Sequence, residues 1–252
     1  MTKSNDSQAK KQVSRRDALK KSSLFTAATA VGFSGLFAGA DSALAAPRRP
    51  RGHDAKDEVL TIASLAATAE TLAITAYYST LAAAGFSLSN EDRLYFKLAM
   101  DAELYHLDIL ESLGGKSLTQ EFYVPAKFLA DESTNLSTFI AAETAFIGAY
   151  LAATRRFAEL GQPRLAATTA QHACSEMEHL SLIRDVAGLV PNPNALPAPI
   201  YYNVSDAVPT LTPFLTGGEG FIGPVKYPGK DAVKALLAGT EAVRIPPFVS
   251  VF

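Results

Sequence analysis

The sequence predicts an all-α protein: a four-helix bundle with one long crossover connection, followed by an irregular C-terminal arm rich in proline and glycine. Four alanine-rich segments, separated by helix stop signals, predict the helices. An internal repeat at an offset of 73 residues relates the second pair of segments to the first. Residues 190–252 hold 10 of the 14 prolines, so this region cannot form one long helix. With 48% hydrophobic and 19% charged residues, the chain belongs to the soluble globular class.

The N-terminus has the organisation of a secretory leader, so we leave residues 1–45 out of the predicted fold. The Ser-Arg-Arg-Asp-Ala-Leu-Lys segment at 14–20 resembles a twin-arginine export signal, although Ala18 replaces the usual phenylalanine. A mildly apolar stretch at 22–40 precedes an Ala-Leu-Ala cleavage site that ends at Ala45. We expect cleavage after Ala45 and a periplasmic or extracellular protein that uses the twin-arginine machinery and keeps no stable membrane anchor. An uncleaved amphipathic anchor is the alternative.

The expected mature chain is acidic. Without residues 1–45 it holds 16 Lys and Arg against 22 Asp and Glu, a net charge of −6 instead of −2. This balance disfavours binding to phosphate backbones, so we expect no nucleic-acid partner. Residues 46–56 combine basic residues with proline and glycine, and we interpret them as a flexible linker.

The chain has one cysteine, Cys174. A single cysteine cannot form an internal disulfide or a CxxC motif, which excludes disulfide scaffolds and metal sites built from several thiolates. We interpret Cys174 as a small, buried apolar residue.

The first helical hairpin follows the linker. Residues 57–84 form an apolar run without glycine or proline, and Gly85 ends the first predicted helix. A short turn leads through Ser89 or Asn90, as N-cap, into a second helix that ends at Gly114-Gly115.

The second hairpin follows a longer connection, residues 116–132. A third helix is expected over residues 133–160, and Pro163 suits the first position of a fourth helix that ends near Gly188. The two hairpins together define the predicted bundle domain, residues 57–189.

The C-terminal extension, residues 190–252, is predicted to wrap on the bundle as an arm. Its proline content leaves room for one short helix over 230–237 and an extended terminal segment over 245–252.

The internal repeat places the same residue types at corresponding heights of the two hairpins. Ala-Glu-Thr, Ala-Tyr and Glu-x-x-His-Leu each occur in both copies at the same offset. Two related hairpins packed face to face would bring these residues opposite one another. The matching pairs are Glu70 with Glu143, Tyr77 with Tyr150, Glu103 with Glu176, and His106 with His179.

The repeated acidic and histidine residues predict a metal site. Glutamate three residues before histidine puts a carboxylate and an imidazole on one helix face, within reach of one ion. One such pair is commonly a surface accident, but here each pair follows, by 33 residues, a glutamate in an apolar helix without neighbouring lysine or arginine. A buried unpaired carboxylate costs several kcal/mol. The candidate ligands are Glu70, Glu103, His106, Glu143, Glu176 and His179.

The chemistry of this set suggests which metals it would bind. Four carboxylates balance the charge of two divalent cations, and two neutral imidazoles complete the ligand set. Oxygen-rich ligation with one nitrogen per ion suits iron or manganese better than structural zinc. We therefore expect two iron or manganese ions.

Residues 57–189 resemble the ferritin-like superfamily of carboxylate-bridged di-iron and di-manganese proteins. The resemblance implies that Glu103 and Glu176 bridge the ions and that His106 and His179 each bind a different one. With the export signal and the proline-rich tail, the chain is similar to exported ferritin-like proteins related to desiccation-associated proteins. This implies redox activity on Fe(II), dioxygen or hydrogen peroxide, as a ferroxidase, oxidase or catalase-like enzyme, and a link to stress.

Further residues have weaker interpretations. Tyr77 and Tyr150 lie seven residues after Glu70 and Glu143, and they either pack in the core, the favoured role, or donate hydrogen bonds near the metals or take part in redox chemistry. His172 lies on the His179 face but corresponds to Ala99 in the repeat, so it lies near the site or is merely buried. Glu178 is expected to face solvent. No catalytic residue is assigned.

Other functions stay open. A non-enzymatic, stress-associated structural or metal-holding protein of the cell envelope would retain the same ligands for stability. Iron storage in a hollow shell is disfavoured by the tail and by export, and rubrerythrin-like electron transfer by the lack of a cysteine-rich motif. The chain could also form a homo-oligomer.

Overall fold

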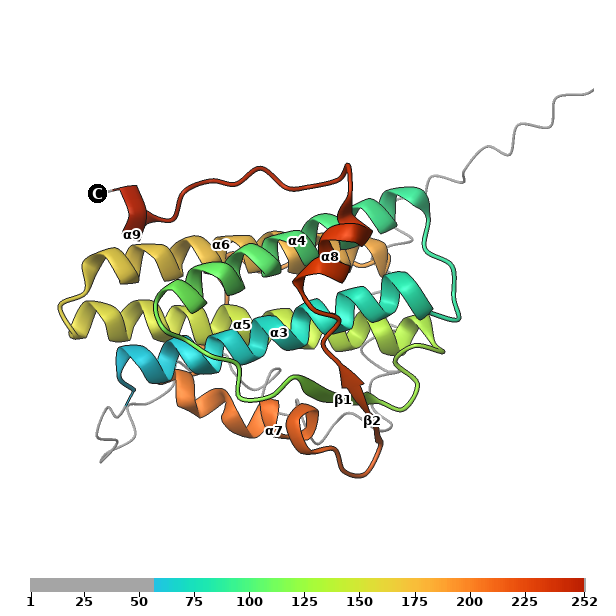
Figure 1. Cartoon of the computed structure of the whole chain (residues 1–252), viewed down its shortest axis with the longest axis horizontal. Coiled ribbons are helices and arrows are strands. Elements are labelled where there is room, and N and C mark those ends of the chain that lie inside the picture. The colour runs from blue at the N-terminus through green and yellow to red at the C-terminus, as the bar shows by residue number, and fades with distance from the viewer. Residues whose placement is uncertain (1–56, 252) are drawn as a thin grey trace, which may run out of the picture.

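The computed structural model describes residues 57–251, so the predicted leader, its cleavage site and the linker lie outside the described residues. The described chain is mostly helical, as predicted, with one small sheet (Figure 1). The long helices are α3 (Val59–Ala83), α4 (Asn90–Ser112), α5 (Glu132–Glu159) and α6 (Pro163–Val186). The shorter elements are β1 (Glu121–Pro125), the 3-10 helix η1 (Val204–Ala207), α7 (Val208–Thr216), β2 (Phe221–Lys226), α8 (Lys230–Leu237) and α9 (Phe248–Val251).

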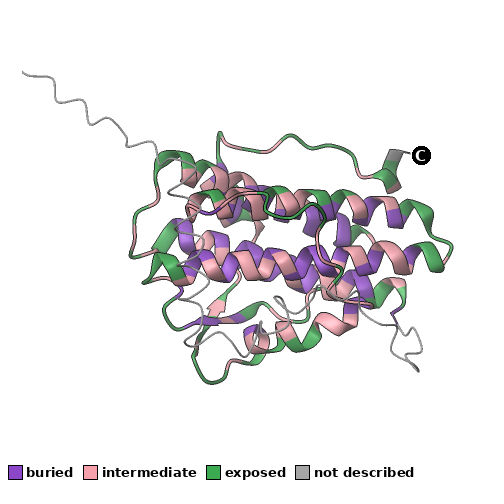
Figure 2. Ribbon diagram, turned by 180° about the vertical axis from the view of Figure 1, so that it is seen from behind, coloured by how far each residue is buried: buried purple, intermediate pink, exposed green. Residues whose placement is uncertain are grey.

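The four long helices lie side by side around a shared apolar core. Figure 2 shows the buried residues along these helices and the exposed residues at helix ends and in connecting segments. Fully burying one large apolar side chain stabilises a fold by about 1.5–3 kcal/mol, so this core supplies much of the driving force for packing. Core side chains include Ile74 and Tyr77 of α3, Met100 and Leu104 of α4, Phe139 of α5 and Ile183 of α6.

The helix ends follow local sequence signals. Ser89 caps α4: its side chain accepts from the Asp92 N–H, and the Asp92 side chain accepts from the Ser89 N–H. Asp131 caps α5 by accepting from the Thr134 N–H at 2.8 Å, so this helix begins one residue earlier than predicted. Pro163 begins α6, as expected.

Helices α3 and α5 are long and apolar enough to cross a membrane by length and composition alone. In the folded chain, 61% of the most apolar window of each helix is buried inside the molecule. Burial against the other helices therefore explains their apolar composition.

The connection between the hairpins and the C-terminal arm contain structure that the sequence did not predict. Strand β1 lies in the connection and pairs antiparallel with β2 of the arm, with Glu121 opposite Lys226 and Pro125 opposite Phe221. Helix α7 forms despite Pro213 in its interior. The predicted helix over residues 230–237 is confirmed as α8, whereas the terminal segment predicted to be extended contains the short helix α9.

The C-terminal arm wraps around the long helices, running from β2 across them to α8 and then α9 (Figure 1). Helix α8 contacts α4, α9 contacts α6, and η1 contacts α3 and α5. Polar contacts hold the arm in place. The Lys230 Nζ lies 2.6 Å from the Asp108 and Glu111 carboxylates, and the Arg244 guanidinium contacts the buried Asp101 carboxylate at 2.5 Å.

Candidate metal centre

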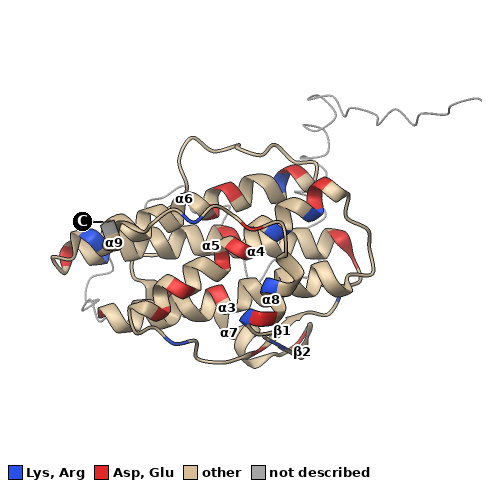
Figure 3. Cartoon of the chain, turned by 45° about the horizontal axis from the view of Figure 1, so that its top comes forward, with Lys and Arg blue, Asp and Glu red and all other residues tan. Residues whose placement is uncertain are grey.

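The structure brings all six predicted ligand side chains into one buried cluster between the four long helices. Helices α3 and α5 each supply one glutamate from mid-helix, and α4 and α6 each supply a Glu-x-x-His pair. The four glutamates are at most 1% exposed and the two histidines 6% exposed. Glu70 is the only charged residue of α3. Figure 3 shows that most of the chain is uncharged, with Lys and Arg in blue and Asp and Glu in red.

The two central carboxylates each face both histidines. Glu103 Oε2 lies 3.0 Å from His106 Nδ1, and its Oε1 lies 3.0 Å from His179 Nδ1. Glu176 repeats the pattern, with Oε1 3.2 Å from His106 Nδ1 and Oε2 3.1 Å from His179 Nδ1. Each oxygen of a central carboxylate is therefore directed to a different histidine, which is the arrangement of a carboxylate that bridges two positions.

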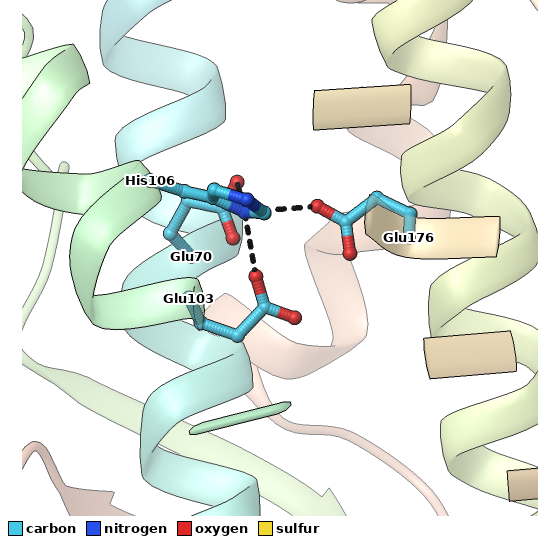
Figure 4. Close-up of side chains that lie close together, drawn as sticks. All are labelled: Glu70, Glu103, His106 and Glu176. Carbon is cyan, nitrogen blue, oxygen red and sulfur yellow. Dashed lines mark hydrogen bonds and ion pairs between the residues drawn. The ribbon is translucent and has the colours of Figure 1, made fainter. Parts of the chain in front are cut away.

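The outer carboxylates complete one group on each side. Glu70 Oε1 lies 3.6 Å from His106 Nδ1, and Glu143 Oε2 lies 3.9 Å from His179 Nδ1. Figure 4 shows the first group, with the His106 imidazole facing Glu70, Glu103 and Glu176. Within each group the ligand atoms lie within 4.8 Å of one another, so each group could hold a metal ion. The groups are Glu70, Glu103, His106 and Glu176, and Glu103, Glu143, Glu176 and His179.

The donor atoms fit a hard or borderline divalent cation. Glu70 and Glu143 each have one buried oxygen, Oε2, without a hydrogen-bond partner among the described residues, whereas both oxygens of Glu103 and of Glu176 lie 3.0–3.2 Å from a histidine nitrogen. Buried oxygens of this kind cost about 1–3 kcal/mol each, and more when charged, unless something satisfies them. Cations held within the two groups would satisfy these oxygens.

Contacts within the cluster lower the pKa values of the two central glutamates and raise those of the two outer glutamates. Burial alone would raise the pKa of Glu103, but the neighbouring His179 and His106 outweigh it and hold the pKa below its ordinary value. Burial and Glu103 would likewise raise the pKa of Glu176, yet the same histidines lower it. The central carboxylates therefore carry the negative charge of the cluster.

The outer glutamates and the histidines have raised pKa values. Burial, followed by repulsion from Glu103 and Glu176, raises the pKa of Glu70 and of Glu143 well above the ordinary value. Burial would lower the pKa values of His106 and His179, but the surrounding carboxylates raise both. The raised pKa values favour the protonated forms of these four groups.

Each outer glutamate is held by a tyrosine of the opposite hairpin. The Tyr77 hydroxyl of α3 donates to Glu143 Oε1 of α5 at 2.5 Å, and the Tyr150 hydroxyl of α5 donates to Glu70 Oε1 of α3. Burial raises the pKa of both tyrosines well above the ordinary value, and nearby carboxylates add to the shift, so both hydroxyls remain donors. The sequence placed the tyrosines on the ligand faces but favoured core packing and did not show the exchange between hairpins.

His172 makes the two halves of the cluster unequal. Its ring centroid lies 4.4 Å from that of His106 and 4.9 Å from that of Tyr150. Nδ1 lies 2.8 Å from the Thr168 carbonyl, and Nε2 is buried without a hydrogen-bond partner in the described part of the chain. Burial, with the neighbouring His106, lowers the pKa of His172 to about 3, so the ring is neutral. His172 lies outside both ligand groups.

Two surface expectations have different outcomes. Glu178 is exposed, as predicted from its position off the ligand face. The prediction of a buried Cys174 is wrong, because the side chain is exposed. Cys174 lies two residues before Glu176, about 200° around the helix from the ligand face, so helical periodicity places it on the outside.

Comparisons with protein-family models, with curated proteins and with solved structures give no match for this chain.

Proposed function

We propose that the four long helices form a ferritin-like four-helix bundle that binds two iron or manganese ions, and that the chain is an exported redox protein. Its substrates would be Fe(II), dioxygen or hydrogen peroxide. The observation that carries the proposal is the directing of the two oxygens of Glu103, and of Glu176, to different histidines. A site built for one ion has no need of two such carboxylates.

The chain's own groups would prepare this site in three ways. The central carboxylates keep their negative charge and attract cations. Tyr77 and Tyr150 fix the outer glutamates by donating to one oxygen of each, which leaves the other oxygen free to bind. Burial between the helices excludes bulk water and strengthens every electrostatic contact. Iron or manganese bound there would supply one-electron redox chemistry.

The decisive experiment measures metal content and oxidation together. Protein from its native host should contain iron or manganese, and it should oxidise Fe(II) with dioxygen or consume hydrogen peroxide. Glu103→Ala should lose both the metal and the activity, whereas Glu178→Ala, at an exposed position of α6, should keep both. Protein that binds neither metal would refute the proposal.

The same comparison separates the non-enzymatic alternative. The buried unsatisfied oxygens favour bound cations for stability alone, because ligands that bind only the folded state stabilise it. If wild type and Glu103→Ala are equally inert and the variant only melts earlier, the chain is a metal-holding envelope protein. A hollow storage shell would elute in gel filtration far ahead of a single chain.

Export in the folded state is part of the proposal and rests on the sequence of residues 1–45. Folded export would let the metals enter the site in the cytoplasm. Replacing Arg15 and Arg16 together by lysine should block export, and normal export of that variant would refute a twin-arginine route.

A further inference from the structure

Two small cavities lie next to each other along α3 and α5. The outer cavity, of about 70 Å³, is bounded by these helices and by η1 and α7 of the C-terminal arm. The inner cavity, of about 20 Å³, extends towards β1. The two cavities share lining residues, so they adjoin one another. The shared residues are Leu72, Ala142, Phe146 and Phe214.

The cavities are largely apolar because alanines line the helices and the polar lining groups other than Glu143 already have partners. In the outer cavity, the Thr169 hydroxyl donates to the Leu165 carbonyl, and the Thr210 hydroxyl accepts from Tyr201 at 3.0 Å. In the inner cavity, the Thr138 hydroxyl donates within its own helix at 2.6 Å. A buried water needs two to four polar partners, and these walls offer few, so the cavities favour an apolar occupant.

Both cavities reach the candidate metal centre. Tyr150 lines the outer cavity, and its hydroxyl donates to Glu70. Glu143 itself lines the inner cavity, and its Oε2 has no hydrogen-bond partner within residues 57–251. The two adjoining cavities, here together called the path, therefore extend from beneath the arm to one of the candidate ligands.

The size and polarity of the path select its occupant. One water-sized sphere needs about 10–15 Å³, so the inner cavity takes a molecule of two atoms, whereas a cavity of about 150 Å³ is needed for benzene. A ferrous ion would lose its hydration in this path, and hydrogen peroxide its hydrogen bonds, at a cost of several kcal/mol. Dioxygen has neither charge nor hydrogen bonds to lose.

We propose that these cavities bind dioxygen and deliver it to the Glu143 side of the metal centre. This assignment rests on the proposed function and narrows it, because it makes dioxygen, rather than peroxide, the oxidant that the fold admits. Phe146 and Phe214, both in the wall between the cavities, would have to move slightly for a molecule to pass.

The first test uses xenon as an apolar probe and needs no metal chemistry. In crystals of the purified chain under xenon pressure, xenon should occupy the outer cavity. Ala145→Leu, which extends a larger side chain into that cavity, should abolish the xenon peak, and Ala158→Leu, at an exposed position of the same helix, should retain it. Ala149→Leu, at a half-buried lining position, provides a second filled variant if the first does not fold. Ordered water in the cavities, or xenon bound only elsewhere, would overturn the assignment.

The second test compares two oxidants. Filling the outer cavity should lower the ratio of dioxygen-dependent to peroxide-dependent Fe(II) oxidation about tenfold, which corresponds to about 1.4 kcal/mol of added barrier. Ala158→Leu should leave the ratio unchanged. An equal fall of both rates, or an unchanged ratio in both filled variants, would overturn the dioxygen route while leaving the proposed function intact. If even the unaltered chain neither oxidises Fe(II) nor consumes hydrogen peroxide, the proposed function itself fails, whatever the xenon result.

Discussion

Removing the Tyr150 hydroxyl tests whether the exchanged tyrosine contacts support the metal centre. In the structure this hydroxyl is the donor to Glu70 Oε1, and Glu70 Oε2 has no other hydrogen-bond partner within the described chain. Tyr150→Phe keeps the ring that lines the outer cavity and packs near His172, so the change is confined to one hydrogen bond.

The size of the effect follows from burial. Tyr150 is 4% exposed and Glu70 is fully buried, so water cannot replace the lost donor. A buried acceptor left unsatisfied costs about 1–3 kcal/mol. For a domain of this length each kcal/mol lowers the melting temperature by about 2–4 °C, so a cost near 2 kcal/mol predicts a fall of about 4–8 °C. Loss of a partner that orients a metal ligand also weakens metal binding by about 10–100-fold.

The measurement is thermal unfolding of the metal-free chain, followed by titration with Mn(II) or Fe(II). Tyr77→Phe should behave like Tyr150→Phe, since Tyr77 holds Glu143 in the same way. Tyr78→Phe is the matched control, because Tyr78 is half-buried and its hydroxyl makes no hydrogen bond to the described part of the chain. If all three variants melt together with wild type and bind metal equally, the hydroxyls do not support the site.

Three further predictions concern the metals, a helix cap and the arm. The two outer glutamates and the two histidines have raised pKa values, so cations that bind to them must displace their protons. Metal binding should therefore release up to four protons per chain, and metal affinity should fall as pH falls. An indicator-dye titration that shows no proton release would contradict this prediction. Asp131→Ala should cost about 1 kcal/mol at neutral pH. Contacts with Thr134 lower the pKa of Asp131 in the folded chain. The contribution of Asp131 to the free energy of unfolding is therefore present above its unfolded pKa and is lost as pH falls through its folded pKa. A stability difference between wild type and Asp131→Ala that persists unchanged in acid would exclude the cap. Asp101→Ala removes the hydrogen bonds that Asp101 accepts from Ala242 and Arg244 of the arm, and it should lower stability by about 1.5–3 kcal/mol. The released arm should then be cut by limited proteolysis. An unchanged cleavage pattern would show that other contacts are sufficient to hold the arm.

The long helices and the ligand cluster could be predicted because local sequence patterns, repeated in both hairpins, specify them. A helix is specified by residues three and four apart, and the offset of 73 residues aligned Glu70 with Glu143 and both Glu-x-x-His pairs. Convergence then follows from packing one hairpin against its copy. The metal-ligand roles themselves stay a prediction.

The missed features depend on contacts between residues far apart in the sequence. Strands β1 and β2 are separated in the sequence by the whole second hairpin, η1 and α7, and neither has enough alternation to indicate its partner. Helix α7 contains Pro213, which local rules count against a helix, yet Phe214 packs against Leu72 and Phe122. Likewise, spacing places Tyr77 on the Glu70 face of α3 but cannot show that its hydroxyl reaches the neighbouring helix.

The exchanged tyrosine contacts have a consequence for the history of the chain. Each hairpin carries a glutamate that accepts a hydrogen bond from the tyrosine of the other copy, and each central carboxylate faces a histidine from both hairpins. A lone hairpin of this design could not assemble the arrangement, but two identical hairpins related by a twofold axis could. Joining them in one polypeptide frees the halves to diverge, and His172 opposite Ala99 is a difference that a symmetric dimer of identical hairpins could not contain.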